Sequence, residues 1–96
     1  MQEVNNQQIV SIEKEMIPNL SFKEAVNIEQ QEGLKERLIE ATKLGNLHRG
    51  KIAIVFRDDE GLKQVETTIW ATGAKYICLK GGVWLPISRI KEVKFL

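Results

Sequence analysis

The sequence predicts an α+β protein, in which one or two N-terminal helices pack on a small, strongly bent, five-stranded antiparallel sheet. Two observations predict this class. The spacing of apolar residues changes near residue 50, from the period of a helix to the period of two that is typical of a strand. Closely spaced turn signals, mostly glycines, then divide the second half into short strands. With 96 residues, the chain has room for one domain with a single small core.

The chain begins with a polar stretch and continues with a helical signal. We expect residues 1–20 to be a polar, partly disordered segment, because its start is rich in Asn and Gln and Pro18 ends any helix there. Ser21 and Glu24 fit a capping box, which predicts a helix that begins at Ser21 and that Gly33 interrupts.

A second helix is predicted over residues 34–44. Its apolar residues form a narrow stripe, and charged residues cover its other faces. The pair Gly45 and Asn46 predicts the end of this helix. We therefore expect a helical segment at 21–46 that forms one domain with a small β-barrel at 47–96.

From residue 51 onward apolar and polar residues alternate, which predicts five strands. They are expected at residues 51–57, 62–72, 76–80 and 83–87, with a last strand that carries Val93 and Phe95. The acidic turn at 58–61 is expected to be solvated. Such a meander loses its open edges when it curls closed, and the usual small solution is an SH3-like or Sm-like barrel. The expected core is Ile52, Ile54, Phe56, Val65, Ile69, Ile77, Leu79, Val83, Leu85, Ile87, Ile90 and Val93.

The turns also predict a register for two hairpins. A turn centred on Gly73 pairs Trp70 with Tyr76, and a turn centred on Gly81 pairs Cys78 with Trp84. Both registers keep the apolar residues on one face of the sheet. The outward face then carries both tryptophans and the only tyrosine. The predicted interaction surface is Trp70, Tyr76, Trp84 and Pro86.

An outward apolar stripe is typical of a contact surface, and three interpretations stay open. The N-terminal helices could cover the stripe as part of the core. The stripe could instead bind a protein partner or a second copy of the chain. It could also stack the bases of single-stranded nucleic acid, with phosphates contacted by Arg49, Lys51, Lys80 and Arg89.

The charge balance makes nucleic acid the less favoured partner. The chain has 14 Lys and Arg against 13 Asp and Glu, a formal charge of +1, unlike a polybasic nucleic-acid-binding protein. Residues 1–50 carry six basic and eight acidic side chains, which leaves −2. Residues 51–96 carry eight basic and five acidic side chains, which leaves a modest +3.

Residues that would carry catalysis or bind a metal are scarce. The single cysteine and single histidine, Cys78 and His48, cannot form an internal disulfide or a structural zinc site. No acid–base pair stands at a motif spacing, so we expect no catalytic residue, no metal and no cofactor. We expect a cytoplasmic protein without membrane contact, because neither a signal-peptide pattern nor a long apolar run occurs.

Three segments carry a resemblance to known proteins: Gly50-Lys-Ile-Ala-Ile-Val-Phe, Val65-Glu-Thr-Thr-Ile-Trp-Ala-Thr and Ile77-Cys-Leu-Lys-Gly-Gly-Val-Trp-Leu-Pro-Ile. They resemble a family of short, uncharacterised proteins from Bacteroidota, over residues 43–93. That resemblance implies no activity and no site residue. The order of a helix and five strands also resembles Sm-like folds, which include bacterial RNA chaperones, and this resemblance implies RNA binding as the alternative function.

We therefore expect a non-catalytic binding or adaptor domain that acts through protein–protein interaction or self-association. The alternative is a single-stranded RNA-binding module of Sm-like type, which would use the outward aromatic side chains and scattered Lys and Arg residues.

Overall fold

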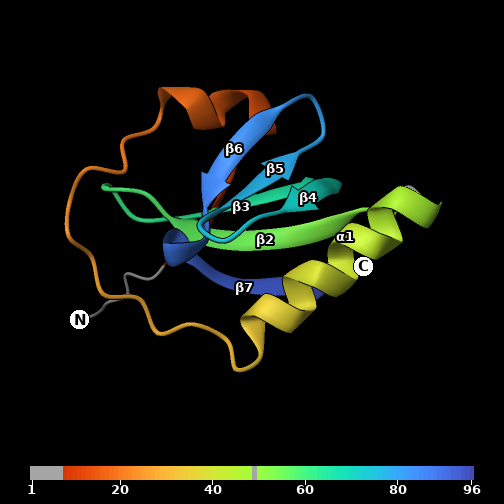
Figure 1. Ribbon diagram of the computed structural model, residues 1–96. Coiled ribbons are helices and arrows are strands. Elements are labelled where there is room, and N and C mark those ends of the chain that lie inside the picture. The colour runs from red at the N-terminus through yellow and green to blue at the C-terminus, as the bar shows by residue number, and fades with distance from the viewer. Residues whose placement is uncertain (1–7, 49) are drawn as a thin grey trace.

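The computed structural model describes residues 8–48 and 50–96 as one long helix with two open sheets (Figure 1). The elements, in chain order, are β1 (Val10–Ser11), the 3-10 helix η1 (Lys14–Asn19), α1 (Leu34–His48), β2 (Ile52–Arg57), β3 (Leu62–Thr67), β4 (Ile69–Thr72), β5 (Tyr76–Leu79), β6 (Val83–Pro86), the 3-10 helix η2 (Ile87–Arg89) and β7 (Ile90–Phe95). The α+β class is confirmed, but α1 is not N-terminal, because β1 and η1 precede it.

The expected closed barrel is wrong: the described strands form a four-stranded sheet in the order β1-β3-β2-β7 and a three-stranded sheet in the order β4-β5-β6. The strand predicted at 62–72 divides at Thr68. β3 pairs with β2 in the first sheet, and β4 pairs with β5 in the second. At this point the chain passes from one sheet to the other. The Thr68 carbonyl still has a backbone partner there, because it accepts a hydrogen bond from the Lys80 N–H at 2.9 Å.

The predicted core is largely confirmed. Ten of its twelve residues are buried, whereas Val83 and Ile87 are half-buried and pack against the others. The structure adds residues from helical segments to this core: Ile17 of η1 and Leu34, Leu38 and Ala41 of α1. The segment 1–20, predicted to be partly disordered, thus contributes to the core through Ile17, and its residues 1–7 lie outside the described residues.

Helix α1 is longer than predicted and packs against β4 and β7. It continues through Gly45 to His48, so the predicted end at Gly45 and Asn46 is wrong. A Cβ atom added at Gly45 would lie 2.6 Å from Thr68 Cγ2 and 2.9 Å from the Ile69 carbonyl oxygen. Glycine is therefore required here because the helix backbone lies against the strand, and not because the helix ends.

The helix predicted from Ser21 is absent, and hydrogen bonds to Asp59 explain why. The Ser21 hydroxyl donates to Asp59 Oδ2 at 2.8 Å, instead of capping a helix. The N–H groups of Lys23 and Glu24 donate to the same carboxylate at 2.9 and 3.1 Å. Burial alone would raise the pKa of Asp59, but these bonds and one from Arg89 outweigh burial and hold the pKa well below its usual range.

The expectation that the acidic turn is solvated is wrong for Asp58 and Asp59, whose carboxylates accept hydrogen bonds within the protein, whereas the Glu60 side chain is 85% exposed. Asp58 is 1% exposed and accepts hydrogen bonds from the N–H groups of Glu60 and Gly61. Lys63 completes the arrangement, with its Nζ 3.1 Å from Asp58 Oδ1. The turn ties the hairpin of β2 and β3 to its neighbours.

No helix of the described residues has the length and apolar character needed to cross a membrane.

Candidate functional site

Of the two predicted hairpin registers, the structure has one and not the other. The register around Gly81 is confirmed, since Leu79, Cys78 and Tyr76 pair with Val83, Trp84 and Pro86. The register around Gly73 is wrong. Ile69 pairs with Leu79 and Ala71 pairs with Cys78, so a β-bulge leaves Trp70 between them without a partner. A bulge bends its strand and re-aims a side chain, here the Trp70 indole.

The outer face of the sheet formed by β4, β5 and β6 is open in the described structure. Trp70, Tyr76 and Trp84 are 48%, 49% and 60% exposed. The other face of the sheet carries Ile77, Leu79 and Leu85, which belong to the core. We call the outer surface, made of Trp70, Ala71, Tyr76, Cys78, Trp84 and Pro86, the aromatic face. Neither η1 nor α1 buries its three aromatic side chains.

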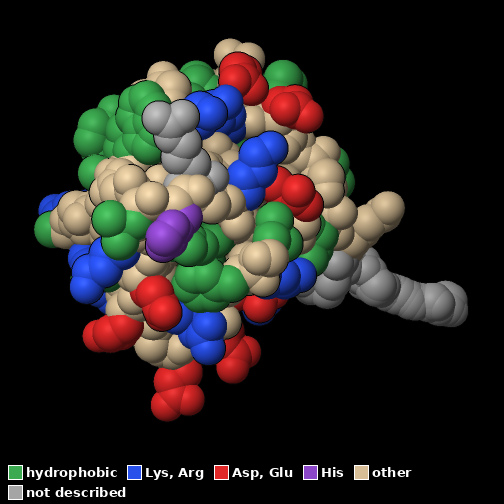
Figure 2. Space-filling view, turned by 90° about the vertical axis from the view of Figure 1, so that its right-hand side faces the viewer, with side chains coloured by type: hydrophobic (Ala, Val, Ile, Leu, Met, Phe, Trp, Pro, Cys, Tyr) green, Lys and Arg blue, Asp and Glu red, His purple; other side chains and the backbone are tan. Residues whose placement is uncertain are grey.

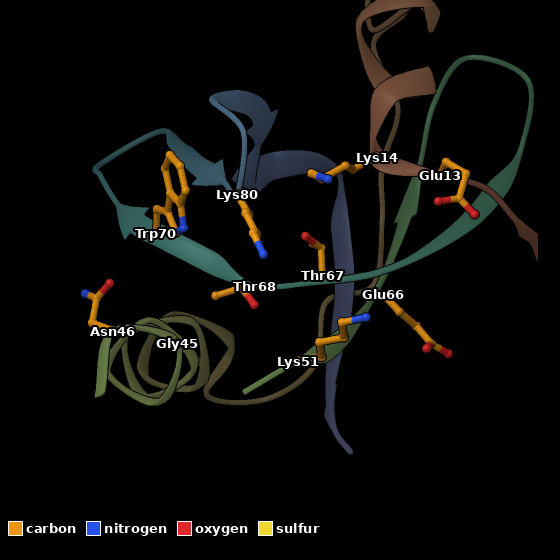
Figure 3. A pocket seen from close by; sticks show the side chains of 10 residues that line it. All are labelled: Glu13, Lys14, Gly45, Asn46, Lys51, Glu66, Thr67, Thr68, Trp70 and Lys80. Atoms are coloured by element: carbon orange, nitrogen blue, oxygen red, sulfur yellow. The ribbon is translucent and has the colours of Figure 1, made fainter. Parts of the chain in front are cut away.

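One end of the aromatic face adjoins a hollow of about 490 Å³ (Figure 3). We call it the lysine hollow, because Lys14, Lys51 and Lys80 reach it from three separate segments. Its other lining residues are Glu13, Gly45, Asn46, Glu66, Thr67, Thr68 and Trp70. Figure 3 shows Lys14 and Lys80 extending toward the space above Thr67, whereas the Glu13 and Glu66 carboxylates lie at its outer side.

The lysines of the hollow are only partly neutralised. Lys14 Nζ lies 2.8 Å from Glu15 Oε2, and this hydrogen bond lowers the pKa of Glu15. Within the described residues, no carboxylate lies within 4.0 Å of the Nζ atom of Lys51 or Lys80. In addition, the chain has no Asp or Glu from residue 67 to residue 91. The surroundings of the aromatic face therefore favour an anion over a cation.

The residues predicted to contact phosphate separate into three groups. Lys51 and Lys80 line the hollow together with Trp70. Arg89 lies elsewhere: it is 4% exposed, donates to Asp59 Oδ1 at 2.9 Å and to the Arg57 carbonyl at 3.1 Å, and also bonds to the Glu24 carbonyl. Its guanidinium stacks on the Phe22 ring at 5.6 Å, so its donors are used inside the protein. Arg49 lies outside the described residues.

The opposite end of the aromatic face has a second, more open hollow of about 450 Å³. Tyr76 and Pro86 line it, next to Lys75 and Gln30.

Sequence reasoning identified Tyr76 and Pro86, but it missed Lys14. That lysine carries no local signal, and only the packing of η1 near the turn between β5 and β6 brings it to the lysine hollow: a Cβ at Gly81 would lie 3.4 Å from Lys14 Cε.

The remaining reactive side chains, His48 and Cys78, do not form a common site. His48 is exposed at the end of α1, and Cys78 is half-buried, with its Sγ 3.7 Å from the Leu79 carbonyl oxygen. Across residues 8–48 and 50–96, no group of three or more His, Cys, Asp and Glu side chains could hold a metal ion. Figure 2 shows basic and acidic side chains interspersed on the face that carries the histidine, without a large field of one charge.

No family model, no curated protein and no solved structure matches the chain.

Proposed function

We propose that this chain is a non-catalytic domain that binds single-stranded nucleic acid, in particular RNA, on its aromatic face. One observation carries the proposal: three exposed aromatic side chains share an open sheet, in a carboxylate-free part of the chain and beside the lysine hollow. The formal charge of +1 by itself favours a protein partner over nucleic acid. We favour nucleic acid because Trp70 lines the same hollow as Lys51 and Lys80.

The aromatic side chains of this face could stack on the bases of a single strand of any sequence. Every base has a flat surface, so an exposed Trp or Tyr can stack on any of them, at about 1–3 kcal/mol per base. Trp70 and Trp84 stand on strands that flank β5, so neighbouring-strand spacing places their backbones about 10 Å apart. That separation lets each indole stack on a different base. The lysines at both ends of the face then supply phosphate contacts.

The proposal rests on this face and not on a resemblance. Two open sheets replace the barrel that the Sm-like resemblance implied, and the family from Bacteroidota contributes no activity. The absence of catalysis and a cytoplasmic location stay predictions.

A second candidate function is binding of a protein, or of a second copy of the chain, through the same face. The observation that favours it is the exposure of three large apolar side chains in a chain with a formal charge of +1. The outer edge of β7 is less suited to pairing. The Gln31 N–H donates to the Lys91 carbonyl at 2.8 Å, and Gln31 Oε1 accepts from the Val93 N–H at 3.1 Å, so Gln31 already occupies part of that edge.

Titration of tryptophan fluorescence with mixed-sequence single-stranded RNA, at low and high salt, tests the proposal. We expect quenching that weakens as salt rises, because phosphate contacts release counterions. Trp84→Ala should weaken binding roughly tenfold, which corresponds to the loss of one stacked base. Leu47→Ala is the matched control, since Leu47 is 75% exposed on α1 and lines neither hollow at the ends of the aromatic face.

Sedimentation of the same samples separates the two candidates. If RNA leaves the fluorescence unchanged and the protein sediments as a dimer that Trp84→Ala dissociates, the nucleic-acid proposal is wrong and self-association takes its place. A monomer that shows no quenching by RNA contradicts the nucleic-acid proposal as well.

A further inference from the structure

We propose that the lysine hollow is a binding site for a nucleoside monophosphate unit, with the ring next to Trp70 and Asn46 and the phosphate among Lys14, Lys51 and Lys80. This inference rests on the proposed function, because the unit would be one nucleotide of the strand that the aromatic face binds. It adds a defined pocket to a face that otherwise stacks bases without selection.

The two ends of the hollow differ in chemistry. Trp70 and Asn46 lie at one end, as Figure 3 shows, and present an indole surface together with an amide that can both donate and accept hydrogen bonds. Lys14 and Lys80 extend over the other end, near Thr67. A flat, polar ring joined to an anionic group matches this division, whereas a purely apolar ligand would offer Lys51 and Lys80 no hydrogen-bond acceptor.

The lysines that line the hollow favour an anionic ligand. Lys14 and Lys80 extend toward the same space above Thr67, and the described structure places no carboxylate within 4.0 Å of Lys51 Nζ or Lys80 Nζ. A phosphate in the hollow would accept charge-assisted hydrogen bonds from these lysines. The sequence also brings these lysines from three distant segments, so their convergence is produced by the tertiary structure and not by a local basic run.

The size and net charge of the hollow suit a single nucleotide. The volume of about 490 Å³ lies within the range of small-molecule sites, about 300–1,000 Å³. Two carboxylates, Glu13 and Glu66, stand at the outer side against three lysines, so the lining carries +1. That balance favours a single phosphate over a polyphosphate chain.

Binding of AMP to a Trp84→Phe variant tests the inference, because Trp70 is then the only tryptophan and reports on the hollow alone. We expect AMP to quench Trp70, and adenosine and inorganic phosphate each to bind more weakly than AMP. Lys14→Gln and Lys80→Gln should each lower AMP affinity roughly tenfold, as expected for a lost charged hydrogen bond. Lys23→Gln is the matched control, since Lys23 is exposed and does not line the hollow.

Thermal unfolding gives a second readout. At one AMP concentration, AMP should raise the melting temperature of the Trp84→Phe protein and of its Lys23→Gln form by similar amounts, and that of its Lys80→Gln form by less, because a ligand stabilises the folded state in proportion to its affinity. Absence of AMP binding, or AMP binding that neither lysine variant weakens, overturns the inference. An affinity for AMP no higher than for adenosine or phosphate alone also overturns it.

The RNA titration shows which proposal has failed. RNA binding that depends on Trp84, together with no AMP binding, leaves the proposed function intact and removes the pocket. AMP binding that depends on Lys14 and Lys80, together with no RNA binding, supports the pocket and removes the proposed function of the aromatic face.

Discussion

Replacing Gly45 by alanine could raise the stability of the protein through helix propensity or lower it through a steric clash. In an exposed helix, Gly→Ala stabilises a protein by about 1 kcal/mol, because glycine has more backbone freedom to lose. In this protein the new methyl group would lie 2.6 Å from Thr68 Cγ2 and 2.9 Å from the Ile69 carbonyl oxygen. Both distances are too short, and the second atom belongs to a strand backbone that cannot rotate away.

The packing cost should exceed the gain in helix propensity. Overpacking a core by one methyl group costs about 1–3 kcal/mol, and the backbone contact places this case near 3 kcal/mol. After the propensity gain, we expect the free energy of unfolding to fall by about 2 kcal/mol. For a domain of this size, the melting temperature should fall by roughly 10 °C, as measured by circular dichroism.

Two further variants control this experiment. Gly61→Ala should be neutral or slightly stabilising, because no atom lies within 4 Å of its added Cβ. Thr68→Ser in the Gly45→Ala background should restore part of the stability, since it removes the nearest atom but leaves the Ile69 carbonyl in place. A Gly45→Ala protein at least as stable as the wild type would refute the argument that close packing of α1 on β4 requires this glycine.

Two predictions concern the pair formed by Arg89 and Asp59. Arg89→Met should lower the urea midpoint, because it removes the hydrogen bonds that the buried guanidinium donates to Asp59 and to the Arg57 and Glu24 carbonyls; a urea midpoint equal to that of the wild type would contradict this. The folded-state pKa of Asp59 lies below its unfolded value, so its contribution to stability is complete above about pH 4 and is lost as the pH falls through the folded-state pKa. Urea midpoints should therefore fall on acidification below about pH 4, less steeply in Asp59→Asn, and equal pH profiles of the two proteins would contradict the role of this carboxylate.

Local pattern was a reliable guide wherever a residue's neighbours in sequence determine its environment. The alternation in β2 and β5 identified Ile54, Ile77 and Leu79 as core residues, and all three are buried. The register around Gly81 was also predictable, because two glycines with φ of 90° and 83° form a tight turn that sets the pairing on both sides. Pattern reasoning failed at Gly73, where a bulge changes the register without a recognisable signal.

The errors share a physical cause, which is competition from partners distant in sequence. Ser21 has the local chemistry of a helix cap, but the Asp59 carboxylate, 38 residues away, takes its hydroxyl. Arg89 has the chemistry of a phosphate contact, but buried carbonyls and Asp59 use its donors. In both cases a long-range hydrogen bond satisfies a group to which the sequence alone assigns a local or solvent-facing role.

The sequence by itself determined the α+β class, most of the core and the outward position of Trp70, Tyr76 and Trp84, because the periodicity of apolar side chains depends only on backbone geometry. The tertiary structure decided that the strands form two open sheets, that α1 rests on β4 through Gly45, and that Lys14 joins Lys51 and Lys80 around one hollow. These features depend on which distant segments pack together, and burial of the whole core, rather than the pattern of any one segment, selects that arrangement.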